Sequence, residues 1–168
     1  MRALVICSVV LMAFGCNPGL GTINLSAELN FPDMGGLRPR AHQTVYLLRN
    51  SIASPEMEEA FKKFMASPTL PGPFGNGNLT ESEKRSRIGF MSSSDGTKIW
   101  HPYIVKTGET DSQGKATFTR LKAGDYWLYS ITRRPGGQWI LWNVPATVKF
   151  YDTTSVTLNN ANISFTVN

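Results

Sequence analysis

The sequence predicts an all-β fold, a sandwich of about seven to eight short strands with one short helical insertion. Apolar and polar residues alternate strictly over 22–29 and 162–167, which is typical of half-buried strands. Further strand-like segments follow residue 98 at close spacing, with turn residues between them. Charged residues make up only 17% of the chain, while Gly and Pro are frequent. Together these features favour a globular β-sandwich.

In the N-terminal half, strands are expected at 22–29 and 44–49, joined by a turn rich in Gly and Pro over 32–39. Residues 52–96 are expected to form a helical insertion that is too short to bury a core of its own. Its first helix begins after Ser54, a capping residue, at Pro55. Apolar residues then follow helical spacing, namely Met57, Ala60, Phe61, Phe64 and Met65.

A second short helix is expected after Thr80, because Thr80 and Glu83 have the spacing of a capping box. Strands are expected to resume over residues 98–106, where His101 alternates with apolar neighbours. The remaining expected strands are 116–120, 125–133, 138–144, 146–151, 155–158 and 162–167. Turn residues at 111–114 and 135–137 separate them.

The segment Thr110–Leu128 carries a pattern with physical meaning. Asp111 can accept backbone hydrogen bonds in a turn that Gly114 closes with a positive φ. Phe118 and Leu121 are expected to point inward, and Tyr126 is expected to bury its ring while its hydroxyl reaches the backbone.

With Thr110, Asp111, Gly114, Phe118, Leu121, Gly124 and Tyr126, this segment resembles the T-D-x-x-G-x-(F)-x-x-L-x-x-G-x-Y pattern of carboxypeptidase regulatory-like domains. The resemblance implies an Ig-like, transthyretin-like sandwich with a carbohydrate-binding-like fold, related to collagen-adhesin B-type repeats. It covers the C-terminal third well and the first strands loosely, and the insertion at 52–96 departs from a minimal member. Proteins of this kind are mostly spacers, adhesion units or parts of surface and uptake complexes.

The N-terminus predicts export. Arg2 is followed by an uncharged apolar run to Phe14 and then by Gly15, so residues 1–15 have the layout of a signal peptide. Met12-Ala13-Phe14-Gly15-Cys16 resembles the lipoprotein box, which implies that the thiol of Cys16 receives a lipid. Ala13 and Gly15 also suit the ordinary signal peptidase, and that alternative gives a plain secreted protein.

The cysteine count favours lipidation. The chain has two cysteines, and Cys7 would be removed with the signal peptide. Cys16 would then remain as a lone thiol, which is unusual for an exported protein unless it is modified. We therefore expect a lipidated N-terminus and spacer at 16–21, a single sandwich domain over 22–168, and anchoring to the bacterial cell envelope. Asn17 in place of Asp favours the outer membrane in a cell with two membranes.

No catalytic or metal-binding motif accompanies the fold. His42 and His101 lack metal-ligand spacing, and no serine or cysteine nucleophile motif is present. A carboxylate pair such as Glu109 with Asp152 remains open. We expect no enzyme, no cofactor and no metal site. The net charge of +5 is scattered apart from 84–87 and 133–134, so no nucleic-acid partner is expected.

One candidate ligand or partner surface remains. Trp127 and Tyr129 should lie on the opposite sheet face from Tyr126, with Trp139 or Trp142 beside them on the next strand. An exposed strip of these rings would stack on sugars or anchor a protein. Alternatively, the helical insertion covers this face with Met57, Phe61 and Phe64, because its apolar side must be buried against another part of the protein.

The sequence thus predicts a non-catalytic, lipid-anchored cell-envelope sandwich acting as a structural or protein-interaction module. The alternative is a carbohydrate-binding surface lipoprotein that uses the aromatic residues between 127 and 142. An enzyme is the third possibility, and it would need a cleft that brings carboxylates or a histidine together. The expected partners are the membrane, through the lipid on Cys16, and an envelope protein or glycan.

Overall fold

The computed structural model of the chain describes residues 19–32, 35–65 and 80–167, with only the backbone at 64 and 65. The strands are β1 (Gly21–Phe31), β2 (Gly36–Pro39), β3 (Thr44–Leu48), β4 (Ile104–Glu109), β5 (Lys115–Leu121), β6 (Gly124–Arg133), β7 (Trp139–Val148), β8 (Thr153–Leu158) and β9 (Ile163–Val167). The helices are α1 (Pro55–Met65), α2 (Glu81–Ser92) and α3 (Ser94–Trp100), and the 3₁₀ turns are η2 (His101–Tyr103) and η3 (Asn160–Asn162).

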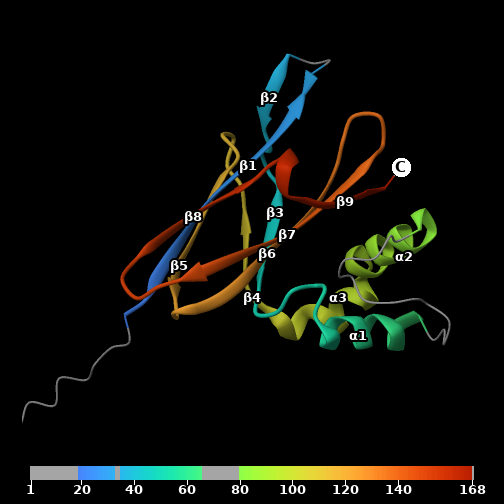
Figure 1. The fold of residues 1–168 in the computed structure, drawn as a ribbon, viewed down its shortest axis with the longest axis horizontal. Helices are drawn as coiled ribbons and strands as arrows, with labels where there is room; N and C mark the ends of the chain where they lie inside the picture. The colour runs from blue at the N-terminus through green and yellow to red at the C-terminus, as the bar shows by residue number, and fades with distance from the viewer. Residues whose placement is uncertain (1–18, 33–34, 66–79, 168) are drawn as a thin grey trace, which may run out of the picture.

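These strands form two sheets that face each other (Figure 1). In the first sheet β1 pairs with β2 and β5 in antiparallel fashion and with β8 in parallel. The second sheet has the order β4-β3-β6-β7-β9, with every pairing antiparallel. The expected all-β sandwich is confirmed, with nine strands in the described part of the chain.

Strict alternation in β1 builds one side of the sandwich core. Ile23, Leu25, Ala27 and Leu29 are buried, while the residues between them are at least partly exposed. They pack with inward residues of the second sheet, which include Leu47, Leu128 and Trp142. Burial of apolar surface between the sheets is the main favourable term in forming this core.

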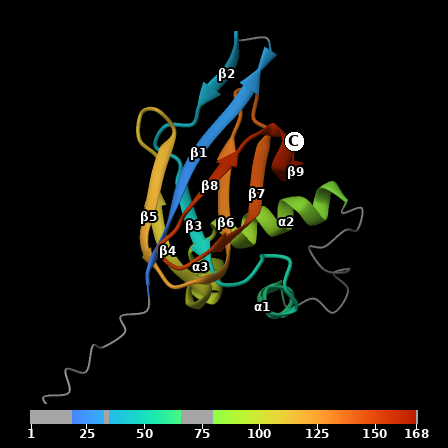
Figure 2. The same ribbon diagram turned by 60° about the vertical axis from the view of Figure 1, so that its left-hand side comes forward.

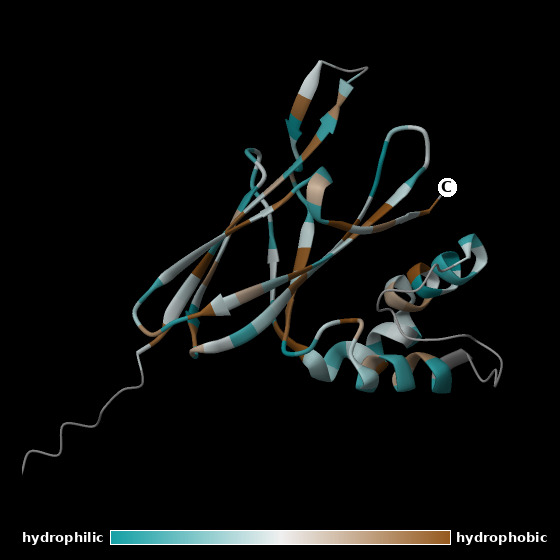
Figure 3. Ribbon diagram, in the orientation of Figure 1, coloured by the Kyte–Doolittle hydropathy of each residue, from teal (hydrophilic) through white to brown (hydrophobic). Residues whose placement is uncertain are grey.

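The other face of the second sheet is covered by the helices (Figures 1 and 2). A second apolar cluster fills this interface, composed of Leu48, Ile52, Met57, Phe61, Phe90, Met91, Trp100, Tyr129 and Leu141. Most charged residues of α1 and α2 are exposed or partly exposed, with Glu58 and Arg87 as buried exceptions, and α1 and the beginning of α2 are mainly hydrophilic in Figure 3. The second sheet is therefore covered on both faces, and consecutive residues are buried, namely Leu128, Tyr129 and Ser130 of β6 and Ile140, Leu141 and Trp142 of β7.

Local signals place both predicted helices correctly. The Ser54 hydroxyl accepts a hydrogen bond from the Met57 N–H, and α1 begins at Pro55. The Thr80 hydroxyl accepts from the Glu83 N–H, while the Glu83 carboxylate accepts from the Thr80 N–H at 2.6 Å. Donation by the Thr80 hydroxyl and N–H lowers the pKa of Glu83. The predicted capping box is confirmed.

The strand expected over 98–106 is wrong for residues 98–103 and correct for residues 104–106. The Ser93 hydroxyl accepts from the Gly96 N–H at 2.9 Å and starts α3, which continues to Trp100. His101 then begins η2, and β4 starts only at Ile104. Burial of Trp100 in the helical cluster outweighs the local alternation, because large rings dominate packing energy.

Two other strand boundaries differ from expectation. The turn expected over 32–39 ends in β2, whose residues pair with an extended β1 that reaches Phe31. The two strands expected at 138–144 and 146–151 are the single strand β7. Pro145 does not interrupt it, because β9 pairs only with residues 139–142 and leaves this stretch with one neighbouring strand.

The predicted turn chemistry over 110–128 is confirmed. The Asp111 carboxylate accepts from the N–H groups of Gln113 and Lys115, and Gly114 has a φ of +73°. A side chain at Gly114 would also come within 2.4 Å of the Ala27 carbonyl oxygen. The buried Tyr126 donates its hydroxyl proton to the Lys122 carbonyl at 2.8 Å.

Candidate functional site

The four predicted aromatic residues do not form one exposed strip. Trp127 and Tyr129 lie on the helix-facing side of the second sheet, whereas Trp142 lies in the core between the sheets. In the register of β6 with β7, Trp142 pairs with Ser130 and not with Tyr129. Adjacent residues of a strand face opposite sides, so Trp142 and Tyr129 are separated by the sheet itself.

Tyr129 is only 1% exposed, and the prediction that it forms a ligand surface is wrong. The rings of Trp100 and Tyr46 lie 5.7 and 6.0 Å from its ring, centroid to centroid. Burial raises the pKa of the Tyr129 hydroxyl well above its ordinary value. The helical cover contains Met57 and Phe61, as the alternative interpretation predicted, while the Phe64 side chain is outside the described residues.

Trp142 is also buried, so its assignment to the candidate surface is wrong too. Its indole N–H donates to the Asn159 carbonyl at 2.9 Å. The side chain therefore satisfies its one polar group inside the protein, which is typical of a structural tryptophan.

The two remaining members of the strip lie near opposite ends of the β6–β7 pair and are partly exposed. Trp127 packs against the helical cluster. Trp139 lies beneath the Arg133 guanidinium, 5.6 Å from the carbon of that group to the ring centroid. Only Trp139 keeps a partly open ring together with a cation, so it is the one strip residue suited to a ligand surface.

The histidines and carboxylates are dispersed. His42 is exposed, and its Nδ1 lies 3.0 Å from a Glu109 carboxylate oxygen. His101 is exposed in η2, away from the strand position predicted for it. Glu109 lies beside Thr44, whereas Asp152 lies beside Thr22 at the beginning of β1. Within the described residues, no group of three His, Cys, Asp or Glu could hold a metal ion.

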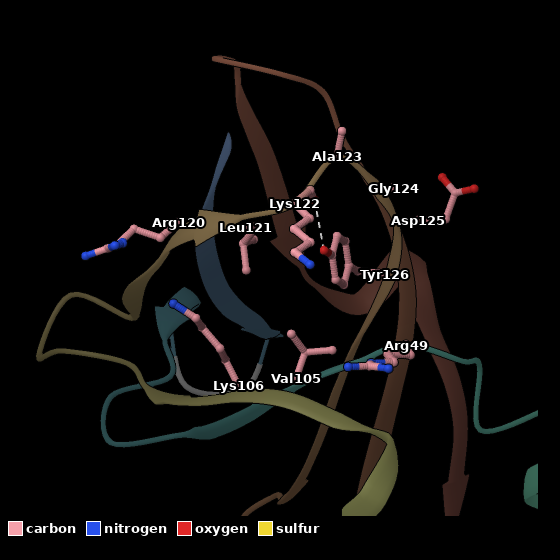
Figure 4. Close-up of a pocket in the computed structure, with 10 residues that line it drawn as sticks. All are labelled: Arg49, Val105, Lys106, Arg120, Leu121, Lys122, Ala123, Gly124, Asp125 and Tyr126. Atoms are coloured by element: carbon pink, nitrogen blue, oxygen red, sulfur yellow. Dashed lines mark hydrogen bonds between the residues drawn. The ribbon is translucent and has the colours of Figure 1, made fainter. Parts of the chain in front are cut away.

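A basic pocket opens beside the turn between β5 and β6 (Figure 4). It has a volume of about 570 Å³ and is lined by Arg49, Val105, Lys106, Arg120, Leu121, Lys122, Ala123, Gly124, Asp125 and Tyr126. Four of these residues are cationic, and the only carboxylate among them, that of Asp125, accepts a hydrogen bond from the Thr147 hydroxyl. Such a lining favours an anionic group.

The pocket belongs to the end of the sandwich at which β1 begins. Gly21 pairs with Leu121, and Gly124 pairs with Val148 at the end of β7. The backbone at Arg120 has a φ of +57°, a left-handed conformation that closes the end of β5. Scattered lysines and arginines in the sequence did not reveal the pocket, because its cations come from the residue after β3, from β4, from β5 and from the β5–β6 turn.

A smaller pocket of about 330 Å³ lies at the opposite end of the sandwich. Its lining residues are Asn30, Phe31, Pro32, Arg134, Pro135, Gly136 and Gln138. The Arg134 guanidinium lies over the Phe31 ring at 5.6 Å and donates to the Gln138 side-chain oxygen at 3.5 Å. The basic pair Arg133-Arg134 could be seen in the sequence. Its contact with Phe31 could not, because that contact forms only where the end of β1 packs against the β6–β7 loop.

Basic residues continue around this pocket. The partly buried Arg40 donates to the Thr132 hydroxyl at 2.6 Å and to the Arg133 carbonyl at 3.4 Å. Burial lowers the pKa of the Arg40 guanidinium. Arg133 itself is exposed beside Trp139. Guanidinium groups held on aromatic rings are well suited to bind carboxylates.

Two predicted features of the N-terminus lie outside the described residues, namely the signal peptide at 1–15 and the lipidation residue Cys16. Among the helices that the structure describes, none is long and apolar enough to cross a membrane.

No protein-family model matches the chain, and no curated protein matches its sequence. Similar solved structures include the minor pilin GBS52 of Streptococcus agalactiae, with 18% identity, a TM-score of 0.43, and coverage of 84% of this chain and 44% of the pilin. A Pseudomonas aeruginosa protein suggested to bind carbohydrate has 17% identity, a TM-score of 0.47, and coverage of 84% of this chain and 89% of its own.

The shaft pilin SpaA of Lactobacillus rhamnosus GG has 12% identity, a TM-score of 0.40, and coverage of 85% of this chain and 50% of the pilin. The chain thus spans about half the length of these pilins.

Proposed function

We propose that this chain is an exported, lipid-anchored β-sandwich of the bacterial cell envelope that acts as a protein-interaction module and not as a catalyst. Cys16 carries the lipid, and in a cell with two membranes the outer membrane holds it. The lipoprotein-like segment 12–16 supports the anchor, and the resemblance of 110–128 to carboxypeptidase regulatory-like domains supports an accessory role.

The observation that carries the interaction role is the separation of the two ends of the sandwich. β1 begins a few residues after Cys16 at one end, and the pocket of Arg134 and Phe31 lies at the other (Figure 1). A protein tethered at Cys16 would therefore present this pocket away from its anchor. The stacked guanidinium favours an acidic side chain of a partner protein.

Anchoring is tested by labelling cells with radioactive palmitate. Wild-type protein should take up label, and Cys16→Ser should take up none. An unlabelled wild type would refute the lipid anchor.

The interaction role is tested by placing a photo-crosslinking residue at Gln138 in the full-length chain, with the exposed Thr119 as the matched position. We expect a discrete envelope-protein adduct from position 138 alone, and Arg134→Ala should abolish it. Equal adducts from both positions, or an adduct that survives Arg134→Ala, would contradict the proposal.

Carbohydrate binding is the second candidate, and the partly exposed Trp139 beside Arg133 favours it. Binding of the protein to an array of envelope glycans distinguishes carbohydrate binding from the protein-interaction role. Binding that is lost in Trp139→Ala, without a protein adduct from position 138, would favour the glycan.

A further inference from the structure

The turn between β7 and β8 leaves two large hydrophobic side chains in solvent. Phe150 is 61% exposed and Tyr151 is 81% exposed. Leu20 is also exposed. Its neighbour Gly19 lies against the Tyr151 ring, where an added Cβ would come within 2.4 Å of Cε2, so Leu20 is close to this turn. Of the four large hydrophobic residues exposed in the described part of the chain, only Leu37 lies elsewhere, in β2 at the opposite end.

This apolar group adjoins the basic pocket. Gly124 of the pocket pairs with Val148, the residue before Lys149, and Gly21 would contact Val148 and the carbonyls of Lys149 and Asp152 if it carried a Cβ. The β7–β8 turn, the β5–β6 turn and the beginning of β1 lie together at one end of the molecule in both ribbon views (Figures 1 and 2).

Positive charge dominates the same end. The cations are Arg49, Lys106, Arg120, Lys122 and Lys149, against the carboxylates of Asp125 and Asp152. Both carboxylates already accept local hydrogen bonds, Asp125 from the Thr147 hydroxyl and Asp152 from the Thr153 N–H. This combination of exposed aromatic rings and surrounding cations matches the chemistry of an anionic bilayer interface, where aromatic rings lie at headgroup level and cations contact phosphates.

The position along the chain also fits a bilayer. Leu20 follows Cys16 by four residues, and a fully extended link of that length spans at most about 14 Å. A lipid on Cys16 would therefore hold this end of the sandwich close to the headgroups.

We propose that Leu20, Phe150, Tyr151 and the surrounding cations form a membrane-docking surface for anionic phospholipid. This proposal rests on the lipid anchor proposed above. The rings enter the headgroup region, while Lys149 and the cations of the basic pocket contact lipid phosphates. Docking orients the sandwich on the membrane, with the pocket of Arg134 and Phe31 at the far end.

The test uses residues 16–168 with Cys16→Ser, a protein that cannot carry the lipid. This stretch contains every strand, helix and core residue that the structure describes. Its sedimentation is measured with vesicles of phosphatidylcholine alone and of phosphatidylcholine mixed with phosphatidylglycerol. We expect binding to the mixed vesicles only, weakened by added salt.

Two variants remove the two components of the surface. Phe150→Ser with Tyr151→Gly should lower the partition coefficient about tenfold, given the apolar area lost. Glycine suits position 151, because Tyr151 has a φ of +56°, so this variant removes the ring while favouring the turn. Lys122→Gln with Lys149→Gln should lower it by about tenfold or more at low salt.

Leu37→Ser is the control, since Leu37 is 57% exposed, a fraction close to that of Phe150, and lies at the opposite end, so this variant should bind like the parent protein. The proposal is overturned if the parent protein does not bind the mixed vesicles, or if the surface variants bind as the control does. Because this protein carries no lipid, its vesicle binding tests the docking surface independently of the anchor. If the wild type is labelled by palmitate but the surface variants bind vesicles like the control, the lipid anchor is supported and the docking surface is refuted.

Discussion

Arg87 on α2 donates two hydrogen bonds to the carboxylate of Glu58 on α1, at 2.7 and 3.2 Å. The two side chains are only 1% and 6% exposed, so this is a buried ion pair. The Arg87 guanidinium also lies over the Phe61 ring, 4.7 Å from its centroid. The pair thus joins the two helices that cover the second sheet.

Breaking this pair should be costly. Arg87→Met leaves the Glu58 carboxylate buried without its partner, and we expect a loss of about 3 kcal/mol in the free energy of unfolding. Urea unfolding followed by circular dichroism measures it, with the exposed neighbour Arg85→Met as control. The double variant Glu58→Leu with Arg87→Met should recover most of the loss, and a double variant as unstable as the single one would contradict this account.

Two glycines of the helical cover should respond to alanine in opposite directions. A Cβ at Gly96 would lie 1.8 Å from the Phe90 carbonyl oxygen, so Gly96→Ala should destabilise the protein by about 2 kcal/mol. Gly89 lies within α2 with open space around its Cβ position, and Gly89→Ala should stabilise by about 0.5–1 kcal/mol. Thermal unfolding of both variants checks the pair, and equal shifts would show that the close approach at Gly96 is not present.

The two tryptophans of β7 should differ strongly. Trp142→Ala removes a fully buried ring and should cost about 3–5 kcal/mol. Trp139→Ala affects a partly exposed ring and should cost about 1 kcal/mol or less. Chemical unfolding of both variants provides the measurement. A small effect at Trp142 would restore the interpretation in which this ring belongs to an exposed strip.

Asp111 should make stability depend on acidity. Hydrogen bonds from the N–H groups of Lys115 and then Gln113 lower its pKa below the ordinary value of 3.8. A lowered pKa in the folded state means that the contribution is complete above about pH 4 and is lost as the pH falls through the folded pKa. Wild type should therefore exceed Asp111→Asn in unfolding midpoint at pH 7, and the difference should close in acid. A difference that does not vary with pH would contradict this.

Much of the framework followed from local patterns. The alternation in 22–29 identified the buried face of β1, Thr80 with Glu83 identified the start of α2, and Tyr126 was correctly expected to bond back to the backbone. These features depend on residues close together in the chain. Residues 98–103 were predicted wrongly because their alternation suits a strand, while burial of Trp100 beneath the helical cover favours a helix.

The candidate site was less predictable for the same reason. Period-two alternation states that Trp127 and Tyr129 share a face, but it does not state what covers that face. The register of β6 with β7 places Trp142 opposite Ser130, and that register is set by the conformation of the turn between the two strands, which the alternation pattern does not specify.

By itself, the sequence determined the all-β class and the helical insertion, because each depends on periodicity or on adjacent residues. The lipidation of Cys16 stays a prediction from the same kind of local signal. Only the tertiary structure decided that Tyr129 and Trp142 are buried. It alone brought Tyr151, Lys122 and the start of β1 to one end of the sandwich. These contacts depend on strand pairs such as β1 with β8, whose residues are far apart in the chain. The burial of apolar surface over the whole core selects among such pairings.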